Sequence, residues 1–253
     1  MKKILSIIIA VAILALGTIP SFAFTVDPKF SVQHNGSTSN YDSLTKAVNA
    51  AKNGDVVVIA SEVMNLTTSE SVTITKNITV KTGNYFNGYK KYIQYNGTSA
   101  PLFTVANGAT LTLANADIFG NTNSSLNAGG LVRVKNGGKL IIDGKAGAEV
   151  IIKNFKLNAK DSKGGAVYCE QGGTVIVNGV TFSDNSASLG RDIFAESEND
   201  VTIKSGVSAD FAFNEEVETN KCPYCGKVHP NNFWGNFVSF FHVIFNFFRS
   251  IFS

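Results

Sequence analysis

Short segments of alternating apolar and polar residues recur along this chain in four pairs. The first members begin at Leu102, Leu131, Ala166 and Asp192, and each second member begins eight residues after its partner. The pairs themselves start 29, 35 and 26 residues apart. A fixed spacing within pairs and a variable spacing between them is typical of a solenoid whose coils have one rigid corner and one variable loop. The pattern therefore predicts an all-β chain wound as a parallel β-helix.

The phase of the alternation predicts which side chains form the core. Successive side chains of a strand point to opposite faces of a sheet. We expect the first and third positions of the strands, among them Arg133, Tyr168 and Asp192, to face outward. The second and fourth positions are apolar in all eight strands, and we expect these sixteen to stack into one hydrophobic column: Phe103, Val105, Leu111, Leu113, Val132, Val134, Leu140, Ile142, Val167, Cys169, Val175, Val177, Ile193, Ala195, Val201 and Ile203.

The start of the chain has the features of a secretory signal peptide. Two lysines precede an apolar run from Ile4 to Leu16, and Ser21-Phe22-Ala23 provides small residues at a cleavage site. We expect cleavage after Ala23 and export of the remaining chain. The expected location is secreted or at the extracellular cell surface.

A helix is predicted upstream of the repeats. Tyr41–Gly54 has apolar side chains on one helical face, a capping residue at Asp42 or Ser43, and a terminating glycine. An uncovered first coil would expose apolar side chains and unpaired strand edges, so we expect this helix to cap it. Strands are expected directly afterwards, at 55–59, 71–74 and 77–80.

The segment from Ser43 to the valine-rich strand after Asp55 resembles the N-terminal cap of the pectin-lyase-like superfamily. That superfamily comprises right-handed parallel β-helices, so the resemblance implies this handedness. Over residues 40–207 the units also resemble polymorphic outer-membrane protein repeats. The Gly-Gly-Ala-Ile element of those repeats is matched by Gly129-Gly130-Leu131-Val132 and Gly164-Gly165-Ala166-Val167, and their Phe-x-x-Asn element by Phe155-x-x-Asn158, Phe182-x-x-Asn185 and, more weakly, Ile118-x-x-Asn121. We expect these asparagines to bond neighbouring backbone.

The superfamily contains polysaccharide lyases and hydrolases, so the resemblance also implies an enzyme for acidic glycans as one interpretation. The hydrolase signatures are absent, although Arg133-Val134-Lys135 is superficially similar to an Arg-Ile-Lys motif. The aspartates that a calcium-dependent lyase requires are scattered. We therefore favour a non-catalytic protein that serves in adhesion or in glycan or protein binding, with no catalytic residues. A polysaccharide lyase or hydrolase is the alternative.

The charge balance and the outward-facing residues of the strands indicate which classes of binding partner the chain suits. Loss of Lys2 and Lys3 with the signal peptide leaves 20 basic and 19 acidic residues, a balance that does not suggest a nucleic-acid partner. Outward positions of the second strands are mostly threonine and isoleucine, as at Thr112, Ile141 and Ile176. Such a flat face suits an extended glycan or a surface protein, although both residue types are also simply good strand formers.

The composition changes after Glu218, where a Cys-x-x-Cys motif is followed by histidine. Cys222, Cys225 and His229 resemble a zinc knuckle, and His242 would complete a four-ligand site. In an exported protein the two cysteines can instead form a disulfide. Zinc and oxidised cysteines therefore stay open as alternatives, and no other cofactor is expected.

The last 21 residues, Phe233–Ser253, are rich in aromatic side chains and contain no acid. Polar residues recur every three or four positions, which predicts an amphipathic helix with a narrow polar stripe. Such a helix binds a membrane surface through its apolar face or covers the open end of a solenoid. The contacts in either case would come from Phe233, Trp234, Phe237, Phe240, Phe241, Phe245 and Phe248.

The predicted organisation thus has five parts. A signal peptide (1–23) and an N-terminal extension (24–40) precede the parallel β-helix (41–210). A linker with the Cys-x-x-Cys…His motif (211–232) leads to the Phe-rich amphipathic helix (233–253).

Overall fold

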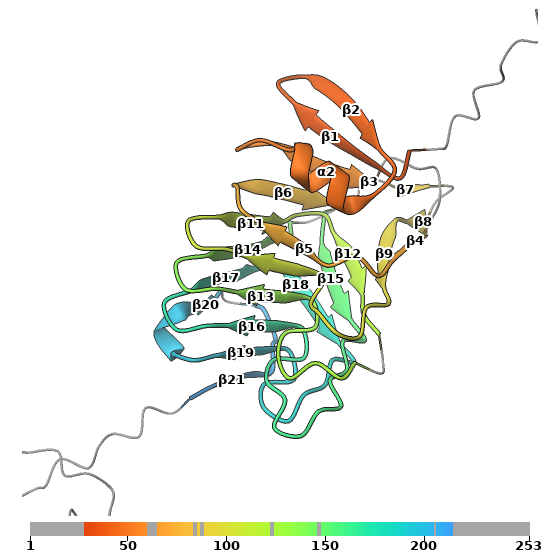
Figure 1. Ribbon diagram of the computed structural model, residues 1–253. Coiled ribbons are helices and arrows are strands. Elements are labelled where there is room, and N and C mark those ends of the chain that lie inside the picture. The colour runs from red at the N-terminus through yellow and green to blue at the C-terminus, as the bar shows by residue number, and fades with distance from the viewer. Residues whose placement is uncertain are drawn as a thin grey trace, which may run out of the picture.

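The computed structural model describes residues 28–59, 65–82, 85–86, 89–121, 124–145, 148–204 and 206–214. Three large sheets account for most of them (Figure 1). Sheet A runs β2 (Ser37–Tyr41), β1 (Phe30–His34), β3 (Val56–Ile59), β6 (Ile78–Lys81), β11 (Thr110–Leu113), β14 (Lys139–Asp143), β17 (Thr174–Asn178), β20 (Val201–Ile203). Sheet B runs β18 (Val180–Ser183), β15 (Val150–Lys153), β12 (Asp117–Phe119), β9 (Tyr92–Tyr95), β4 (Asn65–Thr68). Sheet C runs β21 (Phe211–Phe213), β19 (Ile193–Ala195), β16 (Val167–Cys169), β13 (Val132–Val134), β10 (Phe103–Val105), β5 (Val72–Ile74).

The chain passes from sheet C to sheet A to sheet B and then repeats this order, so each turn of the chain forms one coil. All pairings between coils are parallel, and the four predicted first strands align at Phe103, Val132, Val167 and Ile193. The second strands align in the same way. The prediction of an all-β chain with stacked parallel strands is therefore confirmed. The third strand of each coil, in sheet B, was not predicted.

The core lies between the three sheets and follows the predicted phase. Fourteen of the sixteen predicted inward side chains have no exposed surface. The other two, Val201 and Ile203, are half-buried in the last strand of sheet A. The prediction of outward-facing first positions was wrong for all four first strands, because Leu102, Leu131, Ala166 and Asp192 are buried at the corner before each strand. Phe194 lies on the outer face as predicted, although neighbouring side chains bury it.

Glycines allow the corners of successive coils to stack. Gly137, in the short corner between the paired strands, has φ +71°, and its amide donates to the carbonyl of Gly172 one coil further on. Gly164, before β16, has φ +61°, and a Cβ there would lie 1.9 Å from the carbonyl oxygen of Val167. Only glycine fits the second position, because the strained φ and the close backbone approach coincide.

One α-helix is present among the described residues, and it is shorter than predicted. Helix α2 spans Leu44–Ala50, and the side chain of Ser43 accepts a hydrogen bond from the Lys46 amide as its N-cap. The predicted start at Tyr41 was wrong, because Tyr41 pairs with Phe30 in the β1–β2 hairpin. The predicted apolar face, from Leu44 to Ala51, is buried.

Helix α2 and the hairpin lie together at the N-terminal end of the stack, at the top of Figure 1. The hairpin extends sheet A through antiparallel pairing of β1 with β3, and α2 packs against β1, β2 and β5. A smaller hairpin, β7 (Tyr85–Phe86) with β8 (Tyr89–Lys90), stands apart from the three sheets. The predicted helix at Phe233–Ser253 lies outside the described residues.

The Phe-x-x-Asn matches do not all occupy the same place in a coil. Ile118, Ile152 and Phe182 align across sheet B, so Phe155 occupies the place that Asn185 takes in the next coil. The Phe155-x-x-Asn158 match is therefore displaced by three residues. Asn185 is buried and structural, since its side chain donates to the Ile152 carbonyl and accepts from the Phe155 amide.

Candidate functional site

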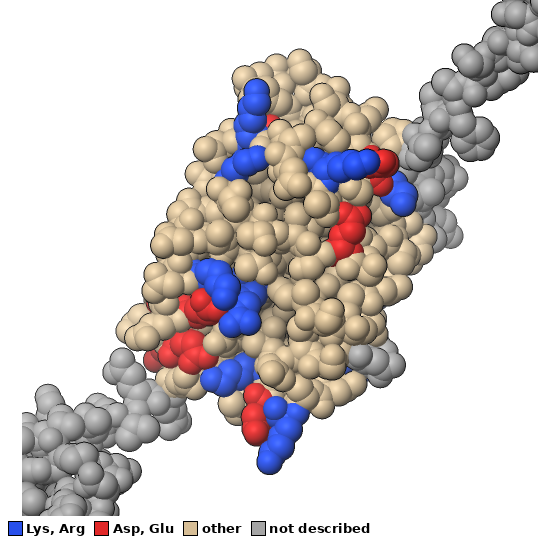
Figure 2. Space-filling view, viewed as in Figure 1, with Lys and Arg blue, Asp and Glu red and all other residues tan. Residues whose placement is uncertain are grey.

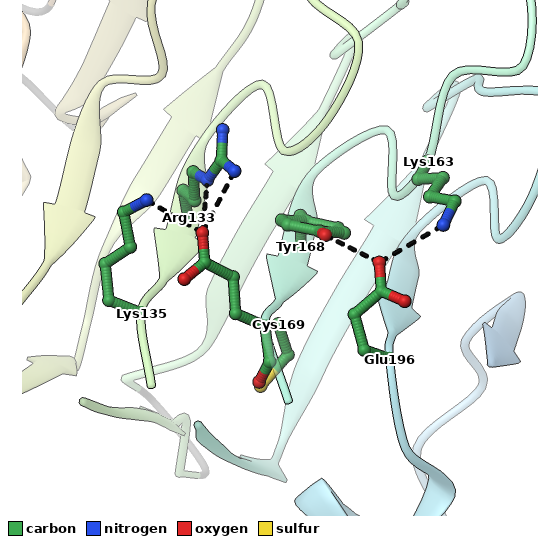
Figure 3. Close-up of polar contacts among 7 residues, drawn as sticks. Arg133, Lys135, Lys163, Tyr168, Cys169 and Glu196 are labelled. Carbon is green, nitrogen blue, oxygen red and sulfur yellow. Dashed lines mark hydrogen bonds and ion pairs between the residues drawn. The ribbon is translucent and has the colours of Figure 1, made fainter. Parts of the chain in front are cut away.

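Charged and aromatic side chains gather on the outer face of sheet C. Figure 2 shows Lys and Arg beside Asp and Glu on the lower half of this face, whereas much of the area above them is uncharged. We call this cluster the sheet C ladder, and it consists of Arg133, Lys135, Lys163, Tyr168, Glu170, Phe194 and Glu196. Figure 3 shows its polar contacts, with the neighbouring Cys169.

The regular stacking of coils brings these residues together. Arg133, Tyr168 and Phe194 are aligned partners at the middle of β13, β16 and β19. Lys135, Glu170 and Glu196 each follow one of these strands, and each amide bonds a carbonyl of the preceding coil. Neighbouring strands are about 4.8 Å apart, so residues 35 or 26 positions apart in the chain become direct neighbours.

Glu170 binds both cations of the preceding coil through a single oxygen. Its Oε1 accepts from Arg133 Nε at 2.9 Å and from Lys135 Nζ at 2.7 Å, and Arg133 Nη2 also lies 2.9 Å away. Its second oxygen makes no such contact with the described residues. Partial burial alone would raise the pKa of Glu170, but the hydrogen bonds from Lys135 and Arg133 outweigh burial and hold the pKa below its ordinary value.

Glu196 repeats this arrangement one coil further on. Its Oε1 accepts from Tyr168 Oη at 2.6 Å and from Lys163 Nζ at 3.1 Å, and its Oε2 accepts from Asn214. Lys163 comes from the loop before β16, whose backbone pairs with neighbouring coils at Ala128 and Leu189. The ladder thus joins four successive coils, from Arg133 to Asn214, through side chains alone.

The rings of Tyr168 and Phe194 stack between cations. Their centroids are 6.1 Å apart with an interplanar angle of 13°, the Arg133 guanidinium lies 5.2 Å from the Tyr168 centroid, and Lys163 Nζ lies 4.5 Å from that of Phe194. Because β13 and β19 flank β16 on opposite sides, both faces of the Tyr168 ring are occupied. A ligand would therefore meet charged and hydroxyl groups rather than an open aromatic face.

Tyr168 of the ladder and the neighbouring Cys169 are not poised for proton transfer or nucleophilic attack. Burial, together with the hydrogen bond to Glu196, raises the pKa of the Tyr168 phenol far above its ordinary value. Burial, with the nearby charges of Asp200 and Glu170, raises the pKa of the Cys169 thiol to about 12. Both groups stay protonated near neutral pH, so neither serves as a base or a nucleophile.

The outer face of sheet A carries the threonines and isoleucines that the sequence predicts. Ile141 and Ile176 are half-buried neighbours in register on β14 and β17. Thr112 pairs with Ile141, and Thr202 pairs with Ile176. The four residues of this row carry no charge, so the face is chemically plain beside the ladder on sheet C.

One buried ion pair outside the ladder is structural. Lys90 Nζ donates to Asp117 at 2.6 Å and to the Glu149 carbonyl at 2.6 Å, joining the small β7–β8 hairpin to sheet B. Burial raises the pKa of Asp117 despite the hydrogen bond from Lys90. The void beside Tyr95, Asn121 and Phe155 has no room for a water molecule, so it offers no ligand cavity.

The site residues chosen from the sequence lie outside the described part of the chain. These are Cys222, Cys225, His229 and His242, and the aromatic set Phe233, Trp234, Phe237, Phe240, Phe241, Phe245 and Phe248. Across residues 28–214, within the described ranges, no three His, Cys, Asp or Glu side chains come together as a metal site. None of the helices described there is long and apolar enough to cross a membrane.

The ladder was not predicted from the sequence, because its two acids are glutamates and, among the acidic residues, only aspartates were weighed as candidate site residues. Lys135, Glu170 and Glu196 each stand immediately after the fourth residue of a predicted first strand. Recurrence of charge at this one repeat position was the available signal. Lys163 has no comparable signal, since it belongs to a variable loop.

Comparison with protein-family models, curated proteins and solved structures finds no match to this chain.

Proposed function

We propose that this chain is an exported, right-handed parallel β-helix of the pectin-lyase-like type that acts without catalysis at the cell surface, in adhesion through glycan or protein binding. The sheet C ladder carries this proposal. It presents three cations, two carboxylates and a phenol on one regular face, and it holds them in place by mutual hydrogen bonds. Preorganised groups of this kind bind a polar ligand without a large loss of side-chain entropy.

Two features support the right-handed form. Connections between parallel strands of one sheet are right-handed in roughly 98% of cases, and the chain returns to each sheet through the other two. The N-terminal segment with Ser43 at a helix N-cap and a strand from Val56 also agrees with the resemblance to the pectin-lyase-like cap.

Binding is favoured over catalysis by the state of the candidate acids and bases. A general acid in glycoside hydrolysis needs a carboxyl group whose pKa is raised, whereas that of Glu170 is lowered. A lyase needs an unprotonated base, whereas Tyr168 is held protonated. The ladder is therefore suited to hold a ligand rather than to transform it.

A polysaccharide lyase or hydrolase acting on acidic glycans is the second candidate. One observation favours it: Glu170 and Glu196 occupy equivalent positions on adjacent coils, with Arg133 and Lys135 beside them. Paired acids next to cations are the groups that an enzyme for uronate polymers requires. An activity assay therefore belongs in the same experiment as the binding assay.

The test is a glycan array probed with the chain from Phe24 to Ser253, followed by titration of the glycans that bind. Arg133→Ala and Glu170→Gln should each weaken binding at least tenfold, a change of about 1.4 kcal/mol. Thr73→Ala is the matched control, because Thr73 is exposed on the same face two strands away. If all three variants bind the glycan as tightly as the unmodified chain does, the ladder is not part of the binding site.

The same variants distinguish the second candidate. The unmodified chain is incubated with polyuronates, and the unsaturated product or new reducing ends are measured. Turnover that disappears in Arg133→Ala and Glu170→Gln would establish the enzyme and overturn the non-catalytic proposal. Binding without turnover supports the proposal as stated.

A further inference from the structure

The two ends of the stack of coils are finished differently. At the N-terminal end, the β1–β2 hairpin and α2 cover the first coil, and Leu44, Ala47 and Ala51 of the helix segment have no exposed surface. At the other end, the sheets stop at β18, β20 and β21. After β20 the described chain consists only of the connection to β21, in which Val207 and Ala209 pack against the core, then β21 itself and Asn214.

The side chains at this second end are those of an interrupted core. Phe211 is the register partner of the fully buried Ile193, and Phe213 is the partner of the fully buried Ala195. Both phenylalanines are nevertheless only half-buried, and their rings contact each other at a centroid distance of 5.7 Å. Val201 and Ile203 of β20 are half-buried for the same reason. We call the surface formed by these four side chains the C-terminal end face.

The chain itself continues from this face. Strand β21 ends at Phe213, and 39 further residues follow Asn214. The first 18 of them, residues 215–232, span at most about 60 Å when extended, which is ample to return across the end of the stack. The remaining segment, Phe233–Ser253, contains no acidic side chain, and its sequence predicts an amphipathic helix with an apolar aromatic face.

We propose that Phe233–Ser253 packs on the C-terminal end face of its own chain and serves as the second cap of the stack. The aromatic side chains of the segment cover Phe211, Phe213, Val201 and Ile203, and its polar stripe faces water. Tethering favours this occupant over a second copy, because a short linker gives an effective concentration of the order of millimolar. The inference does not depend on the function of the ladder.

The test is photocrosslinking in the full exported chain. Phe213 is replaced by p-benzoylphenylalanine, and equal amounts of chains with light and heavy nitrogen are mixed before irradiation. Crosslinks from position 213 to peptides of residues 233–253 within one isotopic chain are the expected result. The same photoreactive residue at Thr104, on the outer face of sheet C, is the control and should give none.

Charge variants test the face that makes the contact. Phe237→Asp with Phe241→Asp places two carboxylates on the apolar side and should reduce the crosslink at least fivefold. Asn236→Asp with Ser239→Asp adds the same charge to the polar stripe and should leave it unchanged. These substitutions lie outside the described core, so the β strands serve as an internal check of folding by circular dichroism.

Other occupants would appear as distinct results. Crosslinks between light and heavy chains would overturn the proposal in favour of a second copy of this chain. Absence of any crosslink to residues 233–253 would also overturn it. Flotation of the chain with vesicles of phosphatidylglycerol and phosphatidylcholine, in that case, would assign the segment to a membrane surface instead.

Discussion

The chemistry of Glu170 depends on the coil that precedes it. Arg133 and Lys135 stand 37 and 35 residues earlier in the sequence, yet both hydrogen-bond its Oε1. Their attraction lowers the pKa of Glu170 although its side chain is only 24% exposed. Arg133 and Lys135 are themselves 39% and 41% exposed, so solvent and salt screen these ion pairs and each contributes little to stability.

This lowered pKa makes a pH-dependent contribution to stability. A carboxyl group with a lower pKa in the folded state stabilises the fold above its unfolded pKa, here the ordinary value of 4.5, and loses that effect as pH falls through the folded pKa. The free energy of unfolding of the unmodified chain should therefore exceed that of Glu170→Gln above about pH 4.5, and the two should converge below it. Urea denaturation at a series of pH values measures the difference.

The control for this series is Glu198→Gln, since Glu198 is exposed and outside the ladder. Its free energy of unfolding should equal that of the unmodified chain at every pH. The free energies of unfolding of Glu170→Gln and of the unmodified chain could instead differ by the same amount at every pH. That result would mean that the ion pairs with Arg133 and Lys135 contribute nothing.

Adjacent residues of β17 test the assignment of inside and outside. Val175 is fully buried, whereas Thr174 is exposed. Val175→Asp removes about 1.5–3 kcal/mol of apolar burial and adds the larger cost of an unpaired buried charge, so we expect the chain to lose its thermal transition or to melt far earlier. Thr174→Asp should change the melting temperature by only a few degrees. If Thr174→Asp lowers the melting temperature more than Val175→Asp does, the assignment of inside and outside is inverted.

At single positions the sequence predicted alternation well and corners poorly. Val175 and its equivalents obey the period of two because both neighbours in the strand are extended. Asp192 stands at a corner, where its carboxylate accepts from the Asn185 side chain and the Asp210 amide. The equivalent first positions of the other three strands, Leu102, Leu131 and Ala166, are apolar and fully buried, so the recurrence of apolar residues at this corner was a signal that the alternation rule missed.

Among the elements, the corners are fixed by glycine for two separable reasons. Gly108 and Gly164 both have positive φ, at +75° and +61°. A Cβ at Gly108 would meet nothing within 4 Å, whereas one at Gly164 would overlap the Val167 carbonyl and approach the Phe194 amide at 3.0 Å. The first position needs only the conformation, and the second needs the space as well.

This pair yields a matched prediction. Gly108→Ala should lower the free energy of unfolding by about 1–2 kcal/mol, the cost of a left-handed backbone for a non-glycine residue. Gly164→Ala should cost clearly more, because the Val167 carbonyl of the same corner must shift to admit the methyl group and the Phe194 amide of the next coil is close as well. Urea denaturation of the two variants under identical conditions measures both values. Equal losses would show that steric contact at Gly164 is relieved without cost.

The third strands of the coils show why one element per coil escaped prediction. Three residues separate β11 from β12, six separate β14 from β15, and one separates β17 from β18. The eight-residue spacing that revealed the first two strands has no counterpart here. Helix α2 is shorter than predicted for a related reason, since pairing with β1 holds Tyr41 in a strand.

The segment with Cys222, Cys225 and His229 carries a prediction that depends only on its motif. If these residues and His242 bind zinc, the reduced exported chain should contain about one zinc per molecule, and Cys225→Ser should lose it. Elemental analysis with thiol titration measures both states. Oxidised Cys222 and Cys225 without zinc would replace the metal site by a disulfide. Cys169 is the internal control, because it is buried and stays reduced.

On the scale of the whole molecule, stability should follow the neighbours of each coil. In a stack of repeats, each unit is stabilised by the interfaces that it forms with the units on either side. Val175 lies in a coil with neighbours on both sides, whereas its register partner Val201 lies in the last strand of sheet A. The two valines therefore report on the interior and on the end of one continuous column.

A double-mutant cycle on these valines tests how the stack is closed. Val175→Ala should cost about 1.5–3 kcal/mol, between the values for smaller and larger core truncations. If Phe233–Ser253 covers the end face, Val201→Ala should cost nearly as much in the full chain. In a chain carrying Phe237→Asp and Phe241→Asp, the cost at Val201 should fall below about 1 kcal/mol while that at Val175 stays the same, because only contacting residues are coupled. If Val201→Ala lowers the free energy of unfolding only slightly in both chains, the aromatic segment does not cover the C-terminal end face and has its partner elsewhere.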